Sequence, residues 1–160
     1  PPEPGARRQG RTNAASCVLR VEDAQGRAVL LTGDIGVAEE AELAPVLRAR
    51  PPLSVLVVPH HGSRSSSSDV LLAATRPGVA VMQLGYRNRY GHPHPEVMAR
   101  YRAAGIDVVR TDACGGWWWD DAGASCTRDV HRRYWHARPV GEAVQAAGAL
   151  VAKPESGENE

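Results

Sequence analysis

The stretch VLVVPHHGSRSSSS, residues 55–68, begins as an unbroken apolar run and ends in two histidines, a glycine and a tract of serines. A continuous apolar run of this kind is typical of a strand that is buried on both faces of a sheet. The run stops at Pro59. The stretch therefore predicts a buried strand with two imidazoles, those of His60 and His61, at its end.

The segments on either side of this stretch alternate between strand and helix patterns. Upstream, β-favouring runs at 16–23 and 28–34 are separated by AQGR, which has the composition of a hairpin turn. The other predicted elements are a helix at 36–50, a strand at 53–58, a helix at 69–77, a strand at 78–85, a helix at 94–105, a strand at 106–112 and a terminal hairpin formed by GWWWDD (116–121) with CTRDVHRRYW (126–135). The order β-β-α-β-α-β-α-β predicts a layered α/β domain.

The composition excludes some classes of protein, but it does not identify a binding partner. With 19 basic and 18 acidic residues, the net charge of +1 neither requires nor excludes a polyanion. No run of 18 apolar residues predicts a membrane span, and the first residues lack a signal-peptide pattern. We expect a soluble folded unit over 13–138, a disordered tail over 1–12 and a flexible tail over 139–160, with a weak helix over 141–152. The start at Pro1, without an initiator Met, suggests a piece of a longer protein.

The three cysteines, Cys17, Cys114 and Cys126, are odd in number and have no Cys-x-x-Cys spacing. This pattern indicates neither a disulfide framework nor a structural zinc site. A bridge between Cys114 and Cys126 is one possibility, and three reduced thiols are the expectation.

Asp34, in LLTGDI, is the first candidate for chemistry. Because it directly follows a predicted strand and a glycine, its carboxylate could point into a cleft at the sheet edge. The alternative is a turn residue or the N-cap of the following helix.

The second candidate is the group His60, His61 and Gly62. Two neutral imidazoles at a strand end can bind a metal, and the hydroxyls of Ser63 and Ser66 could contact phosphate oxygens. The alternative is a pair of surface histidines in a mobile serine-rich linker.

The third candidate is YRNRYGHPHPE, residues 86–96. His92, between a glycine and a proline, is a better candidate for chemistry than His94, which precedes a predicted helix. Arg87 and Asn88 could hold a phosphate group, although loop arginines can also be merely solvated.

Taken in this order, the stretches resemble the C-terminal half of the metallo-β-lactamase-like domain of the ComEC family of bacterial DNA-uptake proteins. The resemblance covers roughly residues 13–135. It rests on LLTGD, VVPHHGSRSSSS, GYRNRYGHPHPEV, a glycine at 105 and RTDACG.

The resemblance implies an αββα sandwich in which loops at one sheet edge hold one or two divalent metal ions, zinc or manganese. In residue terms it implies that Asp34, His60 and His61 ligate metal, one of the two histidines being the family's late histidine ligand. Asp34 would lie between the metals, and His92 would lie at the rim of the active site. The family's chemistry would be metal-dependent hydrolysis of phosphodiesters, proposed to degrade the DNA strand that is not transported.

One departure from the family pattern limits this expectation. The family's first metal-binding motif, Asp-His-x-Gly-Gly, lies before the matched region, and none of the six histidines here follows an aspartate. We therefore expect the chain to hold part of a site, to bind metal weakly and to leave apolar surface uncovered. Its partners would be DNA, the upstream half of the same domain and the channel helices of a parent protein in the bacterial inner membrane.

Two other functions remain open from the sequence. In the first, a non-catalytic DNA-guiding module would hold phosphates with arginines and stack bases on tryptophans; the arginines are Arg87, Arg89, Arg128, Arg132 and Arg133. The second is a metallohydrolase of the same fold that acts on a small ester or lactone, because a fold does not fix a substrate.

Overall fold

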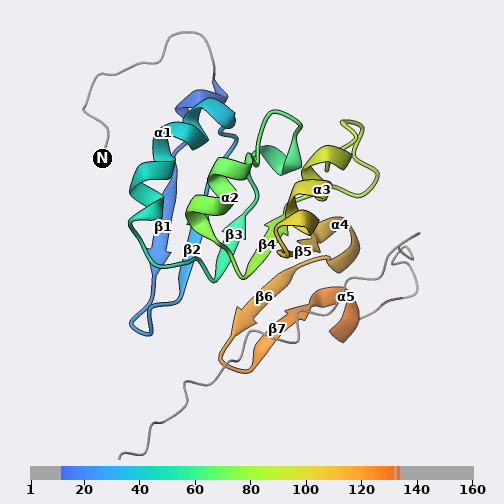
Figure 1. The fold of residues 1–160 in the computed structure, drawn as a ribbon. Coiled ribbons are helices and arrows are strands. Elements are labelled where there is room, and N and C mark those ends of the chain that lie inside the picture. Colours follow the sequence, from blue (N-terminus) through green and yellow to red (C-terminus); the bar gives the residue numbers. More distant parts are fainter. Residues whose placement is uncertain (1–11, 132, 134–160) are drawn as a thin grey trace, which may run out of the picture.

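The computed structural model describes residues 12–131 and 133, which form a five-stranded sheet with helices and an additional hairpin (Figure 1). The strands are β1 (Leu19–Glu22), β2 (Ala28–Leu31), β3 (Val55–Val57), β4 (Val79–Met82), β5 (Asp107–Arg110), β6 (Trp117–Asp120) and β7 (Gly123–Cys126). The helices are α1 (Val37–Arg48), α2 (Asp69–Thr75), α3 (Pro95–Ala103), α4 (Thr111–Cys114) and α5 (Thr127–Val130), with 3₁₀ turns η1 (Asn13–Ala15) and η2 (Pro59–Gly62). The predicted α/β class and the order of the first eight elements are confirmed.

The sheet order is β1-β2-β3-β4-β5. Strand β1 is antiparallel to β2, and each later pair is parallel, with Val55 opposite both Val29 and Val79. All four residues of β4 are buried, as expected for a strand covered on both faces. The carboxyl ends of β2, β3, β4 and β5 consequently lie at the same edge of the sheet.

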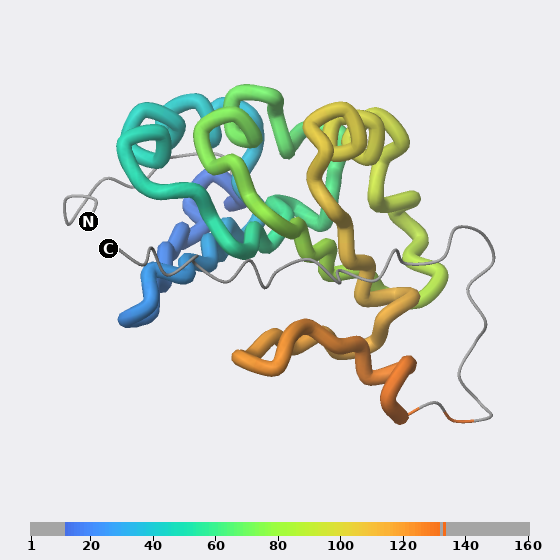
Figure 2. The backbone as a smooth tube through the Cα atoms, turned by 60° about the horizontal axis from the view of Figure 1, so that its bottom comes forward, coloured from blue at the N-terminus to red at the C-terminus, as the bar shows by residue number. Residues whose placement is uncertain are grey.

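Helices α1, α2 and α3 cover one face of this sheet, and the β6–β7 hairpin lies against the other (Figure 2). The helix side buries the larger core, in which Leu30, Leu56, Val97 and Tyr101 are almost completely inaccessible to solvent. The opposite side contains a smaller core of strand valines, against which Trp117 packs. Alternation along the strands thus places successive side chains in two separate cores.

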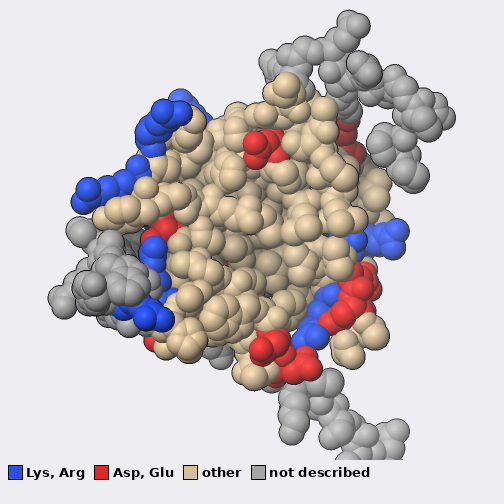
Figure 3. Space-filling view, turned by 180° about the vertical axis from the view of Figure 1, so that it is seen from behind, with Lys and Arg blue, Asp and Glu red and all other residues tan. Residues whose placement is uncertain are grey.

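The hairpin leaves part of its own face of the sheet open. Leu19, Val21 and Leu31 are exposed, and Leu19 and Leu31 are cross-strand partners on the face opposite the helices. Seen from behind, the centre of the molecule carries few charged side chains, and arginines lie toward its edges (Figure 3). The expected uncovered apolar surface is therefore present on β1 and β2.

The C-terminal hairpin differs from the sequence prediction. Its second strand is Gly123–Cys126, because Asp120 turns the chain immediately by accepting a hydrogen bond from the backbone N–H of Ala122 at 2.8 Å. Of the residues that were expected to form that strand, Cys126 ends β7 and Thr127–Val130 form helix α5.

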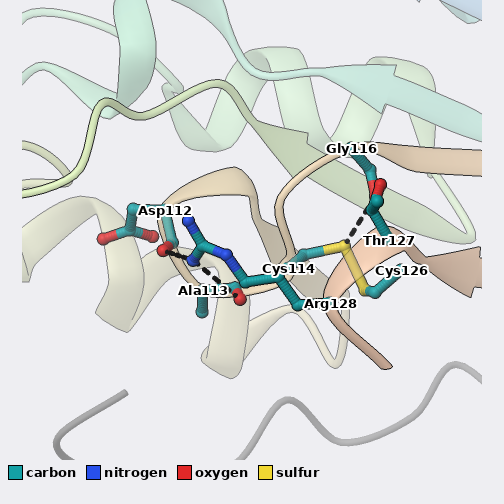
Figure 4. Close-up of a disulfide and its surroundings, with 7 residues drawn as sticks. All are labelled: Asp112, Ala113, Cys114, Gly116, Cys126, Thr127 and Arg128. Atoms are coloured by element: carbon teal, nitrogen blue, oxygen red, sulfur yellow. Dashed lines mark hydrogen bonds between the residues drawn. A yellow bond between two sulfur atoms is a disulfide. The ribbon is translucent and has the colours of Figure 1, made fainter. Parts of the chain in front are cut away.

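The cysteines also differ from expectation. Cys114 at the end of α4 and Cys126 at the end of β7 form a disulfide, so the prediction of three reduced thiols is wrong for this pair (Figure 4). Cys17 is a free, exposed thiol. The side chain of Arg128 donates to the backbone carbonyls of Asp112 and Ala113, which ties α5 to α4 beside the bridge. The disulfide therefore fastens the hairpin to the end of the main sheet.

Two further expectations concern the ends of the chain and membrane-spanning helices. The proposed tails and the weak helix over 141–152 lie outside the described residues, apart from Thr12. None of the helices within 12–131 is long and apolar enough to cross a lipid bilayer.

Candidate functional site

The candidate site lies where the carboxyl ends of the parallel strands meet. The loop 32–36 follows β2, the turn η2 follows β3, and the loop 83–94 follows β4. Because β1 is antiparallel, the segment that precedes it, including Asn13, reaches the same edge. Open α/β sheets bind ligands in this position.

The turn η2 has an unusual backbone. His60, His61 and Gly62 all have positive φ angles, of 50°, 55° and 76°, so three successive residues are in the left-handed region. For a residue with a side chain this conformation costs about 1–2 kcal/mol. The backbone N–H of His60 donates to the carbonyl of Gly33 at 3.1 Å, which fastens the turn to the loop after β2. The chain thereby directs both imidazoles out of the strand end.

The serine tract that follows is packed and is not a mobile linker. Glu40 on α1 is completely buried, and its carboxylate accepts hydrogen bonds from the backbone N–H groups of Ser67 and Ser68 at 2.6 and 2.7 Å. The hydroxyl of Tyr101 donates to Ser67 Oγ at 3.1 Å, and Arg100 donates to the carbonyls of Ser66 and Ser67. Burial raises the pKa of the Tyr101 hydroxyl, so this group remains a donor. Side chains from α1 and α3 therefore fix the tract.

Asp34 and His61 approach each other at this edge. Asp34 Oδ1 lies 3.6 Å from His61 Nε2, and both side chains are partly exposed. The other ring nitrogen of His61, Nδ1, is 2.8 Å from the carbonyl oxygen of Gln83. Since a carbonyl only accepts, Nδ1 must carry the proton and Nε2 presents its lone pair when the ring is neutral. Asp34 is not the cap of α1, because Gly36 occupies that position.

His60 and His92 lie beside this pair. Their ring centroids are 6.2 Å apart, and His60 Nε2 is 3.3 Å from Asn13 Nδ2. The pKa of His92 is lowered, first by burial and then by the charges of neighbouring histidines. A hollow of about 440 Å³, bordered by Asn13, Asp34 and His60, opens next to them. The structure thus brings together the predicted residues Asp34, His60, His61 and His92.

The predicted phosphate-contacting residues have different surroundings. Ser66 is buried and its hydroxyl donates to the carbonyls of Pro59 and Ser63, which gives it a structural role in the turn. Ser63 is partly exposed. Asn88 uses its side chain on the backbone of His92, and Arg87 is exposed.

His94 and several residues of the predicted guiding module also have structural contacts. His94 caps α3 through Nδ1, which accepts from the backbone N–H of Glu96 at 3.3 Å, as its position before the helix suggested. Of the tryptophans in β6, Trp117 and Trp119 pack against the smaller core and Trp118 is exposed. Arg132 lies outside the described residues.

Asp34 and His61 fit two positions around one metal ion. Ligands about 2.0–2.2 Å from a tetrahedral zinc ion lie roughly 3.3–3.6 Å apart, and the observed separation is 3.6 Å. The proton on Nδ1 faces a backbone carbonyl, the arrangement that orients metal-binding histidines. Across residues 12–131 and 133, no three His, Cys, Asp or Glu side chains are grouped closely enough to hold a metal. The separation of Asp34 and His61 alone thus suits a shared ion, and the described residues bring no third ligand to it.

Sequence reasoning missed the residues that support the site. Glu40 and Tyr101 carry no sequence signal. An acid early in a helix is usually solvated, and a tyrosine late in a helix usually contributes only general hydrophobic packing. Asn13, beside His60, and Ser16, whose hydroxyl accepts from the backbone N–H of Asp34 at 3.1 Å, precede β1 in a segment without a motif. Only the fold brings them to the site.

Comparison with known proteins identifies the group to which this arrangement belongs. The chain is 40% identical to Competence protein ComA of Neisseria gonorrhoeae over 139 residues, which cover 85% of the chain and 20% of that protein. It is 42% identical over 103 residues to Recombination protein 2 of Haemophilus influenzae and 36% identical over 106 residues to ComE operon protein 3 of Bacillus subtilis; each match covers 64% of the chain and 13% of the relative. The chain belongs to the ComEC family of competence proteins.

Membership in the ComEC family confirms the resemblance drawn from the motifs. The chain spans about a fifth or less of the length of these ComEC-family relatives. No family model matches it. The names of these relatives place the chain with proteins of competence.

Proposed function

We propose that this chain is part of a metal-dependent phosphodiester hydrolase module in a DNA-uptake protein, and that the module degrades the strand that is not transported. The observation that carries the proposal is the Asp34–His61 pair, in which a carboxylate oxygen and a lone-pair nitrogen lie 3.6 Å apart at the carboxyl edge of the sheet. The similarity to Competence protein ComA supports DNA as the substrate.

In this proposal Asp34 Oδ1 and His61 Nε2 hold a zinc or manganese ion. Such an ion, when bound, lowers the pKa of a coordinated water toward neutrality and offsets the charge of a phosphodiester. The protein's own contribution is orientation: the Gln83 carbonyl fixes the His61 ring. His60 borders the hollow beside Asp34 and could position a phosphate there, with His92 next to it.

The architecture of the module is part of the same proposal. We take the sheet with its helix layer to be the C-terminal half of a metallo-β-lactamase-like αββα sandwich, whose other half would cover the exposed Leu19, Val21 and Leu31. That half would also supply the remaining metal ligands. In the longer relatives it would connect the module to a channel in the bacterial inner membrane.

The first test measures metal binding, because binding by a partial set of ligands does not require turnover. Manganese and zinc titrations followed by calorimetry should give weak saturable binding to the wild type. Asp34→Asn and His61→Asn should each weaken it by about tenfold or more, the size of effect seen for groups that hold or orient a metal. His60→Asn is the matched control, since it changes the neighbouring imidazole in the same left-handed backbone, and it should bind nearly as the wild type does. Equal binding by all four proteins would refute the site.

The second test measures cleavage of labelled single- and double-stranded DNA by the complete domain with manganese, magnesium or zinc. Loss of cleavage in Asp34→Asn and His61→Asn would support a nuclease. Salt-sensitive DNA binding without turnover would instead favour a DNA-guiding module. Hydrolysis of small esters alone would favour an esterase of the same fold.

A further inference from the structure

The loop that follows β4, residues 85–92, exposes two aromatic rings. Tyr86 and Tyr90 are 56% and 69% exposed, the largest values among the exposed large hydrophobic side chains apart from Val46. Each ring has an arginine over it: Arg87 Cζ is 5.3 Å from the Tyr86 centroid, and Arg89 Cζ is 5.3 Å from the Tyr90 centroid. The loop therefore presents two cation–π pairs to solvent.

These arginines remain available to a ligand. Within residues 12–131, no carboxylate forms an ion pair with Arg87 or Arg89. Arg89 also donates to the hydroxyl of Tyr90 at 3.2 Å, which holds its guanidinium beside the ring. Each aromatic face thus has a positive charge beside it that is not neutralised by the described part of the protein.

The loop has a fixed shape. The side chain of Asn88 accepts from the backbone N–H of His92 at 3.0 Å and donates to the His92 carbonyl at 2.7 Å, so it closes the loop. Next to the loop, the backbone N–H of His94 donates to the carbonyl of Gly62 at 2.9 Å. Pro93 lies so close to Gly62 that a Cβ atom added to the glycine would be 3.0 Å from Pro93 Cβ. The loop is consequently held against the turn that carries the candidate metal ligand (Figure 1).

A line of rings connects the loop to the candidate site. The Tyr90 and His92 rings are nearly parallel, with centroids 6.0 Å apart and an interplanar angle of 20°. From His92 the next ring, that of His60, is 6.2 Å away. His61 follows directly in the chain and faces Asp34. A polymer that contacts Tyr90 would therefore lie within a few nucleotides of the Asp34–His61 pair.

We propose that the 85–92 loop is a stacking platform for single-stranded DNA, with Tyr86 and Tyr90 stacking on bases and Arg87 and Arg89 holding the adjacent phosphates. Exposed rings with neighbouring cations suit this ligand, because every base has a π face and every nucleotide carries a negative charge. Duplex DNA fits poorly, since its bases are already stacked on one another. The choice of DNA rests on the proposed function. The stacking itself does not require the metal.

The test measures equilibrium binding by fluorescence anisotropy in the presence of EDTA, with three labelled ligands of equal length. These are oligo-dT, an abasic single strand that has the phosphates without bases, and a blunt duplex. The wild type should bind oligo-dT most tightly. Tyr86→Leu with Tyr90→Leu should weaken oligo-dT binding by about tenfold for each lost stack and leave abasic binding nearly unchanged.

The matched control is Tyr86→Phe with Tyr90→Phe, which keeps both rings and should bind oligo-dT within about twofold of the wild type. Arg87→Gln with Arg89→Gln should weaken oligo-dT and abasic binding alike and reduce the salt dependence. Equal binding of oligo-dT and the abasic strand by the wild type would overturn the proposal, as would unchanged oligo-dT binding by the leucine variant. Tight duplex binding would overturn it as well.

Failure of this proposal and failure of the proposed hydrolase can be told apart. Oligo-dT binding is measured in EDTA and metal binding is measured without DNA, so each experiment reports on one proposal alone. If Asp34→Asn and His61→Asn keep metal affinity unchanged but the leucine variant loses oligo-dT binding, the platform stands and the metal site does not. The reverse result would leave the metal site and refute the platform.

Discussion

Removing the Cys114–Cys126 disulfide should destabilise the folded chain by about 3 kcal/mol. The two cysteines are 12 residues apart in sequence, and a bridge that closes a loop of about this length lowers the entropy of the unfolded chain by roughly 9–10 cal/mol/K. At 25 °C this corresponds to about 3 kcal/mol, or roughly a hundredfold change in the ratio of folded to unfolded molecules. Because the bridge fastens β7 to α4, the hairpin should be the first part to unfold when the bridge is removed.

Urea unfolding with and without a thiol reductant measures this quantity. Trp117, Trp118 and Trp119 all lie in β6, so tryptophan fluorescence reports strongly on the hairpin, while circular dichroism reports on α1 to α3. With a slope of about 1–3 kcal/mol per molar urea, reduction should lower the midpoint by about 1–3 M. Replacing the exposed Cys17 by serine in every protein prevents disulfide exchange.

The control is Cys114→Ala with Cys126→Ala, whose midpoint should not respond to reductant and should match that of the reduced wild type within a few tenths of a kcal/mol. A wild type whose midpoint is the same in both conditions would refute the reasoning. A fluorescence change on reduction without a change in circular dichroism would show that the bridge stabilises the hairpin alone.

Three further predictions concern the packing beneath the site. Gly62→Ala should cost about 1–2 kcal/mol in thermal unfolding, since φ is +76° and the new Cβ would meet Pro93 at 3.0 Å; a melting temperature equal to that of the wild type would contradict this. Glu40→Gln should cost about 2–4 kcal/mol by urea unfolding, because one of the two N–H groups of Ser67 and Ser68 would then face an amide N–H, whereas Glu39→Gln should cost much less. Burial raises the pKa of Tyr101 above the ordinary value of 10, so the unfolded chain loses this proton first and stability should fall as pH rises above about 10. Tyr101→Phe should lose about 1 kcal/mol at pH 7 and show a smaller alkaline decline, which chemical unfolding at pH 7 and pH 10.5 would detect; equal declines in both proteins would contradict the assignment.

Local patterns were enough to predict the elements of the main sheet. The apolar run before Pro59 and the position of His94 just ahead of a helix are encoded within a few residues, and the structure shows both. The convergence of Asp34 with His61 also followed from local order, because residues that end parallel strands meet at one edge. Predictions of this kind succeed when the deciding contacts are near in sequence.

The contacts that were not predicted join distant residues. Glu40 binds Ser67 and Ser68 across 27 and 28 positions, and nothing near Glu40 marks it as buried. The contact that fixes the His61 ring, and on which the proposed preference for His61 over His60 rests, is made by the carbonyl of Gln83, a backbone group that no motif marks. The Cys114–Cys126 bridge was kept only as the less favoured possibility because the cysteines have no Cys-x-x-Cys spacing, and nothing local shows that the ends of α4 and β7 meet.

Because β2, β3, β4 and β5 are parallel, the candidate site lies at one end of the sheet and the turn between β1 and β2 lies at the opposite end. That turn contacts the β6–β7 hairpin through Arg27, which pairs with Asp121 at 2.7 Å and lies over the Trp119 ring. Gln25 is exposed in that turn, ahead of the start of β2, whereas His60 and His61 follow the end of the parallel strand β3. A dye or surface tether attached at position 25 would therefore leave the ligand-facing loops untouched, and single-molecule observation of the chain on DNA could begin from that position.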